Sequence, residues 1–358
     1  MPADVFAFPY QGIDLKINSS IAETYDDNIN FSKNEKEEDF ITELLLGIDA
    51  RYEGKRRFLN LGGNINQRFH FRFPDIKSSS ENIRLNFRNE FSEYDTLQLN
   101  YNYSHSQAPE SFEDEFGRVE TRRSSYKNAF DAIYYKQFSE RLNSSFRYIY
   151  SLSIVPEETS SDSSLNGIGL NLNYLHNASS TLYISYDFSD IKYKGGGNIS
   201  FQILAAGFKK YITRQLFLDG RVGIDIVDPD IGQGYITESY DVSLTDEIDR
   251  NTVMKLSFQR SDEATSERED IFRNWQLTGN VTREFTDKVA GSIEVFYGKG
   301  KYVTLSEGST FLGASTNFAY NVTERLSGKA GYRYSNRDST IDTEYTRNTA
   351  SIGLSYIF

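Results

Sequence analysis

Residues 351–358, Ser351-Ile352-Gly353-Leu354-Ser355-Tyr356-Ile357-Phe358, decide the fold of this chain. In an extended strand, alternate side chains point to opposite faces, so Ile352, Leu354, Tyr356 and Phe358 share one face. Chain ends are usually polar and frayed, whereas this one stops on an aromatic residue. The pattern indicates a terminal β-strand with one wholly apolar face.

The same alternation recurs along the rest of the chain. Residues 97–103, 142–154 and 216–226 each keep apolar side chains at one parity. No apolar run approaches the roughly 18 residues that a membrane helix needs. A helical membrane protein is therefore excluded. A transmembrane β-barrel is not, because each of its strands needs apolar residues only at alternate positions.

The connections between these segments alternate in kind. Eight are short and polar, and an aromatic residue often precedes them, as at Phe91, Phe138, Tyr211, Phe285 and Tyr320. Nine are looser and mostly longer, and we place them at residues 28–38, 74–80, 107–122, 155–163, 192–197, 228–233, 263–268, 302–307 and 338–341. Seventeen connections require eighteen strands.

This layout predicts an all-β fold, a transmembrane antiparallel up-and-down β-barrel of about 18 strands in the bacterial outer membrane, with both termini periplasmic. Residues 1–11 would be a short periplasmic segment, without the basic start or long apolar core of a signal peptide, and residues 12–358 a single barrel domain. The alternative is a soluble propeller or sandwich. Aromatic residues at strand ends, the even alternation of connections and Phe358 favour the membrane.

A barrel of this size is too wide for its own side chains to fill, so it should enclose water unless it is plugged. Parity predicts which charged side chains line that lumen. We expect a basic sector of Lys16, Arg51, Arg68, His70, Arg72, Arg84 and Arg88. We expect a mixed sector of Arg147, Asp187, Asp219, Arg221, Asp225, Asp241, Lys255, Glu294, Lys329 and Arg333.

Two interpretations of the basic sector stay open. In one, Asp14, Glu43, Asp49 and Glu90 neutralise it and the wall is simply solvated. In the other, it forms a positively lined path for an anionic solute, because inward side chains tune the selectivity of such pores. The formal net charge of −12 argues against a nucleic-acid partner.

Support for enzymatic chemistry is thin. The chain has no cysteine and three histidines, of which His105 lies between Ser104 and Ser106. A Ser/His pair with a carboxylate could serve a barrel hydrolase, but no glycine-flanked nucleophile supports it. The acidic stretches 35–39 and 110–115 lack the spacing of a calcium loop and are interpreted as solvated loops. We therefore expect no catalytic residues, no metal and no cofactor.

The segment Glu23-Thr24-Tyr25-Asp26-Asp27-Asn28-Ile29, together with Phe358, resembles the opening and closing strands of a family of outer-membrane β-barrel porins of Gram-negative bacteria. Several members of that family are associated with exopolysaccharide export. The resemblance implies that outer-membrane lipid and lipopolysaccharide surround the barrel, and that the assembly machinery reads Tyr356 and Phe358. It also implies polysaccharide and periplasmic export partners.

Three functions follow from these observations. The first is a channel for export or diffusion of a polar or anionic solute, with exopolysaccharide secretion as the specific candidate. The second is a structural or partner-gated barrel in an envelope complex. The third is an outer-membrane hydrolase that depends on His105.

Overall fold

The structure, a computed structural model, describes residues 12–76, 78–107, 124–156, 162–265, 270–303, 308–340 and 344–358. Its strands are β1 (Ile13–Asp26), β2 (Asp39–Glu53), β3 (Arg57–His70), β4 (Ser78–Glu90), β5 (Asp95–Ser106), β6 (Ser125–Gln137), β7 (Leu142–Ile154), β8 (Ser163–Asn177), β9 (Ser180–Tyr193), β10 (Asn198–Tyr211), β11 (Leu216–Pro229), β12 (Tyr235–Asp249), β13 (Thr252–Thr265), β14 (Asp270–Thr286), β15 (Val289–Tyr302), β16 (Gly308–Asn321), β17 (Leu326–Ser339) and β18 (Tyr345–Ile357).

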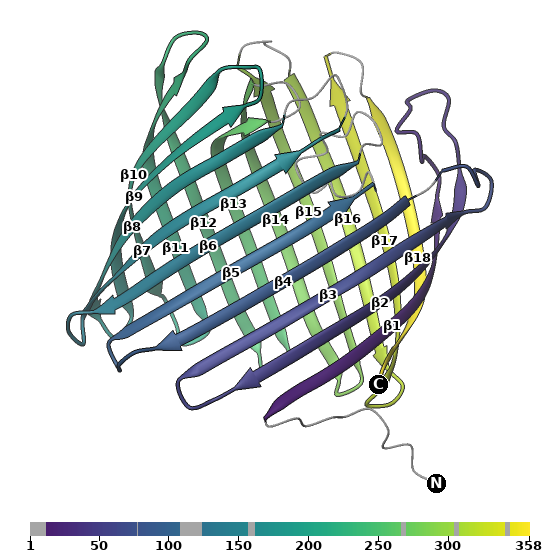
Figure 1. Cartoon of the computed structure of the whole chain (residues 1–358), viewed down its shortest axis with the longest axis horizontal. Coiled ribbons are helices and arrows are strands. Elements are labelled where there is room, and N and C mark those ends of the chain that lie inside the picture. Colours follow the sequence, from purple (N-terminus) through teal and green to yellow (C-terminus); the bar gives the residue numbers. More distant parts are fainter. Residues whose placement is uncertain are drawn as a thin grey trace.

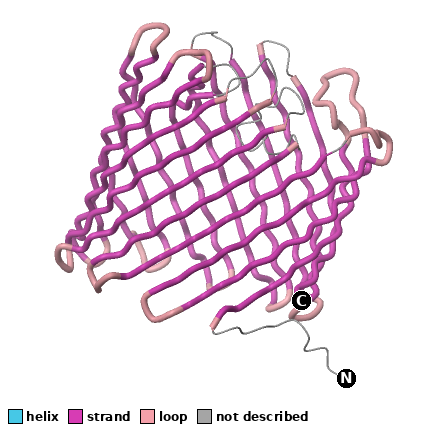
Figure 2. Tube along the Cα trace, in the orientation of Figure 1, coloured by secondary structure: helices cyan, strands magenta, loops and turns pink. Residues whose placement is uncertain are grey.

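The strands form one closed antiparallel barrel, as the sequence predicts (Figures 1 and 2). Each strand pairs with its neighbours in sequence, and β1 also pairs with β18 from Asn18↔Ile357 to Asp26↔Thr349. Closure leaves no free strand edge, so the backbone polar groups of the wall are satisfied within hydrocarbon. Residues 1–11 lie outside the described residues, and so does the acidic stretch 110–115.

No helix in the described parts of the chain is long and apolar enough to cross a membrane.

The short connections gather at one rim, which we call the turn rim, and the longer ones at the other, the loop rim. The carboxyl terminus lies at the turn rim (Figure 1). Four turns share one hydrogen-bonding device: the hydroxyl oxygen of Ser139, Thr213, Thr286 or Thr323 accepts the backbone N–H groups two and three residues later. Such local bonds favour turns over continued strand, which explains why the wall reverses there.

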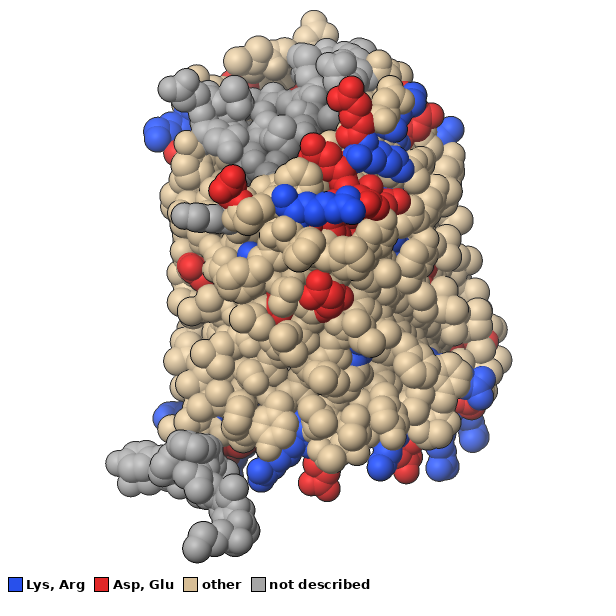
Figure 3. Space-filling model, turned by 90° about the vertical axis from the view of Figure 1, so that its right-hand side faces the viewer, with Lys and Arg blue, Asp and Glu red and all other residues tan. Residues whose placement is uncertain are grey.

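The outer face is a belt of apolar side chains. Strand register places Leu46 beside Ile65 on this face, and they are 59% and 58% exposed. Side chains this apolar and this exposed require lipid rather than water around them. Figure 3 shows the resulting belt, in which few charged residues appear, between two rims where charged residues gather. Exposed Phe91, Phe138, Phe285 and Tyr320 border it at the turn rim, where aromatic rings favour the membrane interface.

Candidate functional site: the lumen wall

The inner face of β3, β4 and β5 carries a continuous polar surface, the amide wall. Register sets its side chains in transverse rows, for example Asn60, Asn86 and Asn100. The Nδ2 of Asn82 donates to the Oδ1 of Asn102 at 2.8 Å. The full set is Asn60, Asn64, Asn66, Arg68, Asn82, Arg84, Asn86, Arg88, Gln98, Asn100 and Asn102. Because each amide both donates and accepts, this wall can exchange hydrogen bonds with hydroxyl groups.

The predicted basic residues of this region are held in ion pairs. Arg84 Nη2 lies 2.8 Å from Asp49 Oδ1, and Arg68 Nε lies 3.2 Å from Glu43 Oε1. The other pairs are Arg88–Glu90 at 2.6 Å, Arg51–Glu53 at 2.7 Å and Lys16–Asp14 at 3.4 Å. Most of these groups are solvent-exposed, so each pair contributes at most about 1 kcal/mol. Their effect is to cancel charge locally, which reduces the positive potential of the wall.

The two remaining basic residues lie at the loop rim. His70 Nδ1 lies 2.9 Å from Asp39 Oδ2, and both side chains are fully buried. The backbone N–H of Arg72 donates to the other oxygen of Asp39 at 2.8 Å. Arg72 Nη1 also donates to Glu38 Oε1 at 2.6 Å. Hydrogen bonds from Tyr25 and Arg72 hold the pKa of the Glu38 carboxyl below its usual value.

The mixed sector is partly neutralised, with three of its ten members in ion pairs. Arg147 Nη2 lies 2.7 Å from Asp131 Oδ2, and Arg221 Nη2 lies 3.3 Å from Asp187 Oδ2. Two further carboxylates accept hydroxyl hydrogen bonds, Asp219 from Tyr183 at 2.9 Å and Asp225 from Ser239 at 2.7 Å. Register places the remaining members, Asp241, Lys255, Glu294, Lys329 and Arg333, on the same inner face.

Among the described residues, Lys255, Lys329, Asp241 and Glu294 make no ion pair. No group of three or more His, Asp or Glu side chains in the described ranges is arranged to hold a metal ion.

A buried polar cluster, the seam clasp, joins β1 to β18 at the loop rim. Asp26 accepts three contacts of 2.6–3.1 Å from the Arg347 guanidinium, and the two side chains are 0% and 2% exposed. Asp27 accepts from both the backbone and the side chain of Asn348 at 2.7 Å. Asn28 Nδ2 donates to the carbonyl of Thr346 at 2.9 Å. The Asp26-Asp27-Asn28 motif of the sequence thus closes the barrel wall.

The connection between β1 and β2, residues 27–38, folds over this clasp. Phe31 has a φ of 53°, which is strained for a bulky residue. Its ring lies 4.6 Å from the Arg347 guanidinium and 5.1 Å from the Tyr345 ring. Lys33 forms an ion pair with Glu344. Because Tyr345 and Arg347 belong to the inner face of β18, this connection narrows the mouth of the lumen.

The tip of the β13–β14 hairpin, which we call the inner hairpin (261–264 and 270–273), separates from β12 but stays paired with β15. Pairing of β12 with β13 ends at Tyr240↔Arg260, whereas β13 and β14 stay paired to Thr265↔Asp270. Where the ladder stops, Arg260 Nη1 donates to the free carbonyl of Glu238 at 2.6 Å. A side chain thus satisfies a backbone group that a strand would otherwise bond.

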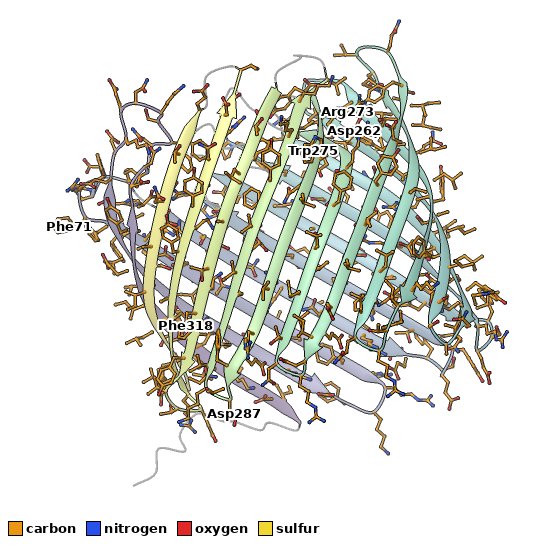
Figure 4. All side chains as sticks on the ribbon, turned by 180° about the vertical axis from the view of Figure 1, so that it is seen from behind. Phe71, Asp262, Arg273, Trp275, Asp287 and Phe318 are labelled. Carbon is orange, nitrogen blue, oxygen red and sulfur yellow. The ribbon has the colours of Figure 1, made fainter. Side chains whose placement is uncertain are left out.

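The inner hairpin packs inside the barrel. Ile271 lies in a buried cluster with Ile199 and Val227, which belong to the inner faces of β10 and β11. The hydroxyl of Tyr235 donates to Asp262 Oδ2 at 2.8 Å, and Asp262 also pairs with Arg273 at 3.0 Å (Figure 4). The hairpin and the 27–38 connection together constrict the loop rim from two sides.

His105 lies on the outer face of β5, whereas its sequence neighbours Ser104 and Ser106 lie on the inner face. Its partners are instead Glu81 and Tyr126 on the adjacent strands and Ser124, which directly precedes β6. His105 Nε2 lies 3.1 Å from Ser124 Oγ, and Nδ1 lies 3.5 Å from Glu81 Oε2. The Tyr126 ring stacks on the imidazole at 4.3 Å.

Comparison with known proteins agrees with this fold. Residues 237–357 match the family model described as "Putative beta-barrel porin 2", which spans β12 to β18. The resemblance to β-barrel porins is confirmed over this part of the chain, which contains β18 but neither Phe358 nor the Tyr25–Ile29 motif. A search of curated proteins found no match.

Similar solved structures are outer-membrane barrels. The siderophore receptor PirA from Acinetobacter baumannii has a TM-score of 0.52 and 8% identity, covering 96% of this chain and 80% of that one. The outer membrane protein opdK from Pseudomonas aeruginosa has a TM-score of 0.51 and 10% identity, with 96% and 99% covered. OccAB4 from Acinetobacter baumannii has a TM-score of 0.51 and 10% identity, and the alignment covers 98% of this chain and 100% of that one. Fold and family match place this barrel in the bacterial outer membrane.

Proposed function

We propose that this porin-type barrel is a channel for a polar, hydroxyl-rich solute, with an exopolysaccharide as the specific substrate. The observation that carries the proposal is the amide wall. Eleven inner-face positions on three neighbouring strands are amides or arginines, interrupted by Gly62, and the arginines are paired with carboxylates. Such a surface offers many weak, interchangeable hydrogen bonds and little net charge, which suits a sliding sugar polymer.

The proposed orientation follows from the rims. Tight turns face the periplasm in barrels of this class, so the turn rim and both termini would be periplasmic and the loop rim would face outward. Polymer would enter at the turn rim from periplasmic export partners and leave past the constriction at the loop rim. Lipid and lipopolysaccharide would contact the apolar belt, and the assembly machinery would read Tyr356 and Phe358.

Single-channel conductance in a planar bilayer tests the proposal, with the reversal potential measured under a salt gradient. We expect a steady conductance with weak ion selectivity, and block by added polysaccharide. Strong anion selectivity would favour the positively lined path instead. A silent membrane despite correct insertion would favour the structural or partner-gated barrel.

A second candidate function is lipid hydrolysis. It is favoured by the line Ser124–His105–Glu81, in which the hydroxyl meets Nε2 and the carboxylate meets Nδ1, the order required of a nucleophile, base and orienting acid. The site would open toward the lipid at the loop rim. Replacement of His105 by alanine should then abolish hydrolysis of a phospholipid ester by the folded protein, while an inactive wild-type protein would rule this function out.

A further inference from the structure

A recess opens in the inner wall at the turn rim, where the amide wall ends. Its volume is about 500 Å³, within the range of small-molecule sites. It is lined by residues 53–57 around the β2–β3 turn, by Phe58 and by side chains of β4 and β5. The residues of those two strands are Asn86, Phe87, Arg88, Glu90, Gln98 and Asn100. The recess therefore lies where a solute would first meet the lumen from this rim.

The floor of the recess combines one aromatic ring with two rows of polar groups. Phe58 lies beside Arg88, and Arg88 beside Gln98, in one row. The next row holds Asn86 and Asn100. A sugar ring presents a C–H face that packs on an aromatic ring and hydroxyl groups that pair with amides.

The charged groups of the recess are mainly basic, because its two carboxylates, Glu53 and Glu90, are already paired with Arg51 and Arg88. Lys55 and Arg56 make no ion pair with any described residue, whereas Arg88 is paired with Glu90 at 2.6 Å. Two cations without fixed partners at the edge of a polar recess favour an anionic substituent there, and a guanidinium can bind a carboxylate through two hydrogen bonds.

We propose that this recess is an entry subsite that binds a short saccharide segment carrying a carboxylate. Rings pack on Phe58 and the amide rows, and the carboxylate lies against Arg56 and Lys55. This inference rests on the proposed export function, because it names the substrate class that the channel would take up at this rim.

Calorimetric titration of the detergent-solubilised, folded protein tests it, with trigalacturonic acid as the anionic probe and maltotriose as the neutral one. Phe58→Leu and Gln98→Ala should each weaken binding of trigalacturonic acid at least tenfold, as should Arg56→Gln. Phe217→Leu is the matched control. Phe58 is half-buried, and one face of its ring is covered by the Arg51 guanidinium at 5.2 Å. Phe217 is likewise a half-buried inner-face phenyl at the turn rim under a cation, Lys209 at 4.5 Å, but Tyr211 and Thr245 flank it instead of amides.

Equal loss of binding in Phe217→Leu, or unchanged binding in the recess variants, would overturn the subsite. Tighter binding of maltotriose than of trigalacturonic acid would overturn its anionic specificity. Conductance of the same preparations separates the two proposals: a conducting barrel without saccharide binding removes only the subsite. A silent barrel that still binds the probe removes only the channel. Heat-dependent gel migration verifies that every variant is folded.

Discussion

Breaking the seam clasp should destabilise the barrel far more than breaking a lumenal ion pair. The change is Arg347→Met. Methionine replaces the unbranched aliphatic part of the arginine side chain but lacks the guanidinium that pairs with Asp26. Asp26 is 0% exposed, so water does not replace the lost partner. Removing one partner of a buried pair costs about 3–5 kcal/mol, and that loss is expected here.

Arg84→Met is the matched control. Arg84 on β4 also pairs with an aspartate, Asp49 of β2, at 2.8 Å across β3, but the two side chains are 48% and 34% exposed. Lumen water can hydrate the abandoned Asp49, so the expected cost is roughly 0–1 kcal/mol. The double variant Asp26→Asn/Arg347→Met should recover part of the loss, because no uncompensated charge stays buried.

The free energy of unfolding can be measured by urea titration in phospholipid vesicles. The chain has one tryptophan, Trp275, which packs near Phe258 and Tyr297 on the outer face of the wall. Its emission therefore reports whether β14 has left the lipid. An Arg347→Met barrel that is as stable as the Arg84→Met barrel would refute the reasoning that burial makes the clasp strong.

Three other outcomes are expected. Ile271→Asp places a charge in the buried cluster that holds the inner hairpin. Because this should displace the hairpin from the lumen, single-channel conductance should rise. Ile293→Asp places a charge on the outer belt and should prevent insertion instead. The hydrogen bond from Lys33 lowers the pKa of Glu344, so this contact is present above the usual glutamate pKa of about 4.3 and is lost as pH falls through the lowered value. The noise of the single-channel current should increase below that pH, and the Glu344→Gln channel should show the same noise at neutral pH. Lys329→Gln removes a cation without an ion-pair partner among the described residues, and Arg84→Gln leaves Asp49 unpaired. Each removes one positive charge from the lumen, so both should shift the reversal potential toward cation preference by a similar amount.

The strands of the wall are predictable from sequence because lipid on one side and lumen water on the other impose an alternation of apolar and polar residues. Lipid accepts only apolar groups such as Leu46 and Ile65, and water favours their neighbours such as Asn64 and Asn66, so parity identifies the faces. The predicted strand number is confirmed, and so is the predicted kind of fold. The strand ends were less predictable. Residues 78–80 were expected in a loop but begin β4, because strand beyond the membrane has no lipid to enforce alternation.

The clasp and the inner hairpin could not be predicted from local patterns. Asp26 and Arg347 are 321 positions apart, and nothing near either residue indicates the other. The inner hairpin depends on β13 leaving β12 after Arg260, a choice made by the packing of Ile271 on distant strands. The ion pair of Arg84 with Asp49 is easier to predict, because parity places both residues on the same inner face. His105 was expected beside serines of its own strand, but alternation turns those to the opposite face.

The hydroxyl-fixed turns at Ser139, Thr213, Thr286 and Thr323 have a consequence for the order in which the wall assembles. Each closes only a few residues of chain, so the loop-closure entropy is small and hairpin pairing can begin within microseconds. The connections at the opposite end are longer and gain no such start. Strand pairing should therefore begin at the turn rim and extend toward the loop rim. The constricting segments would then be ordered last, and their sequences are free to vary without delaying the nucleation of the strands beneath them.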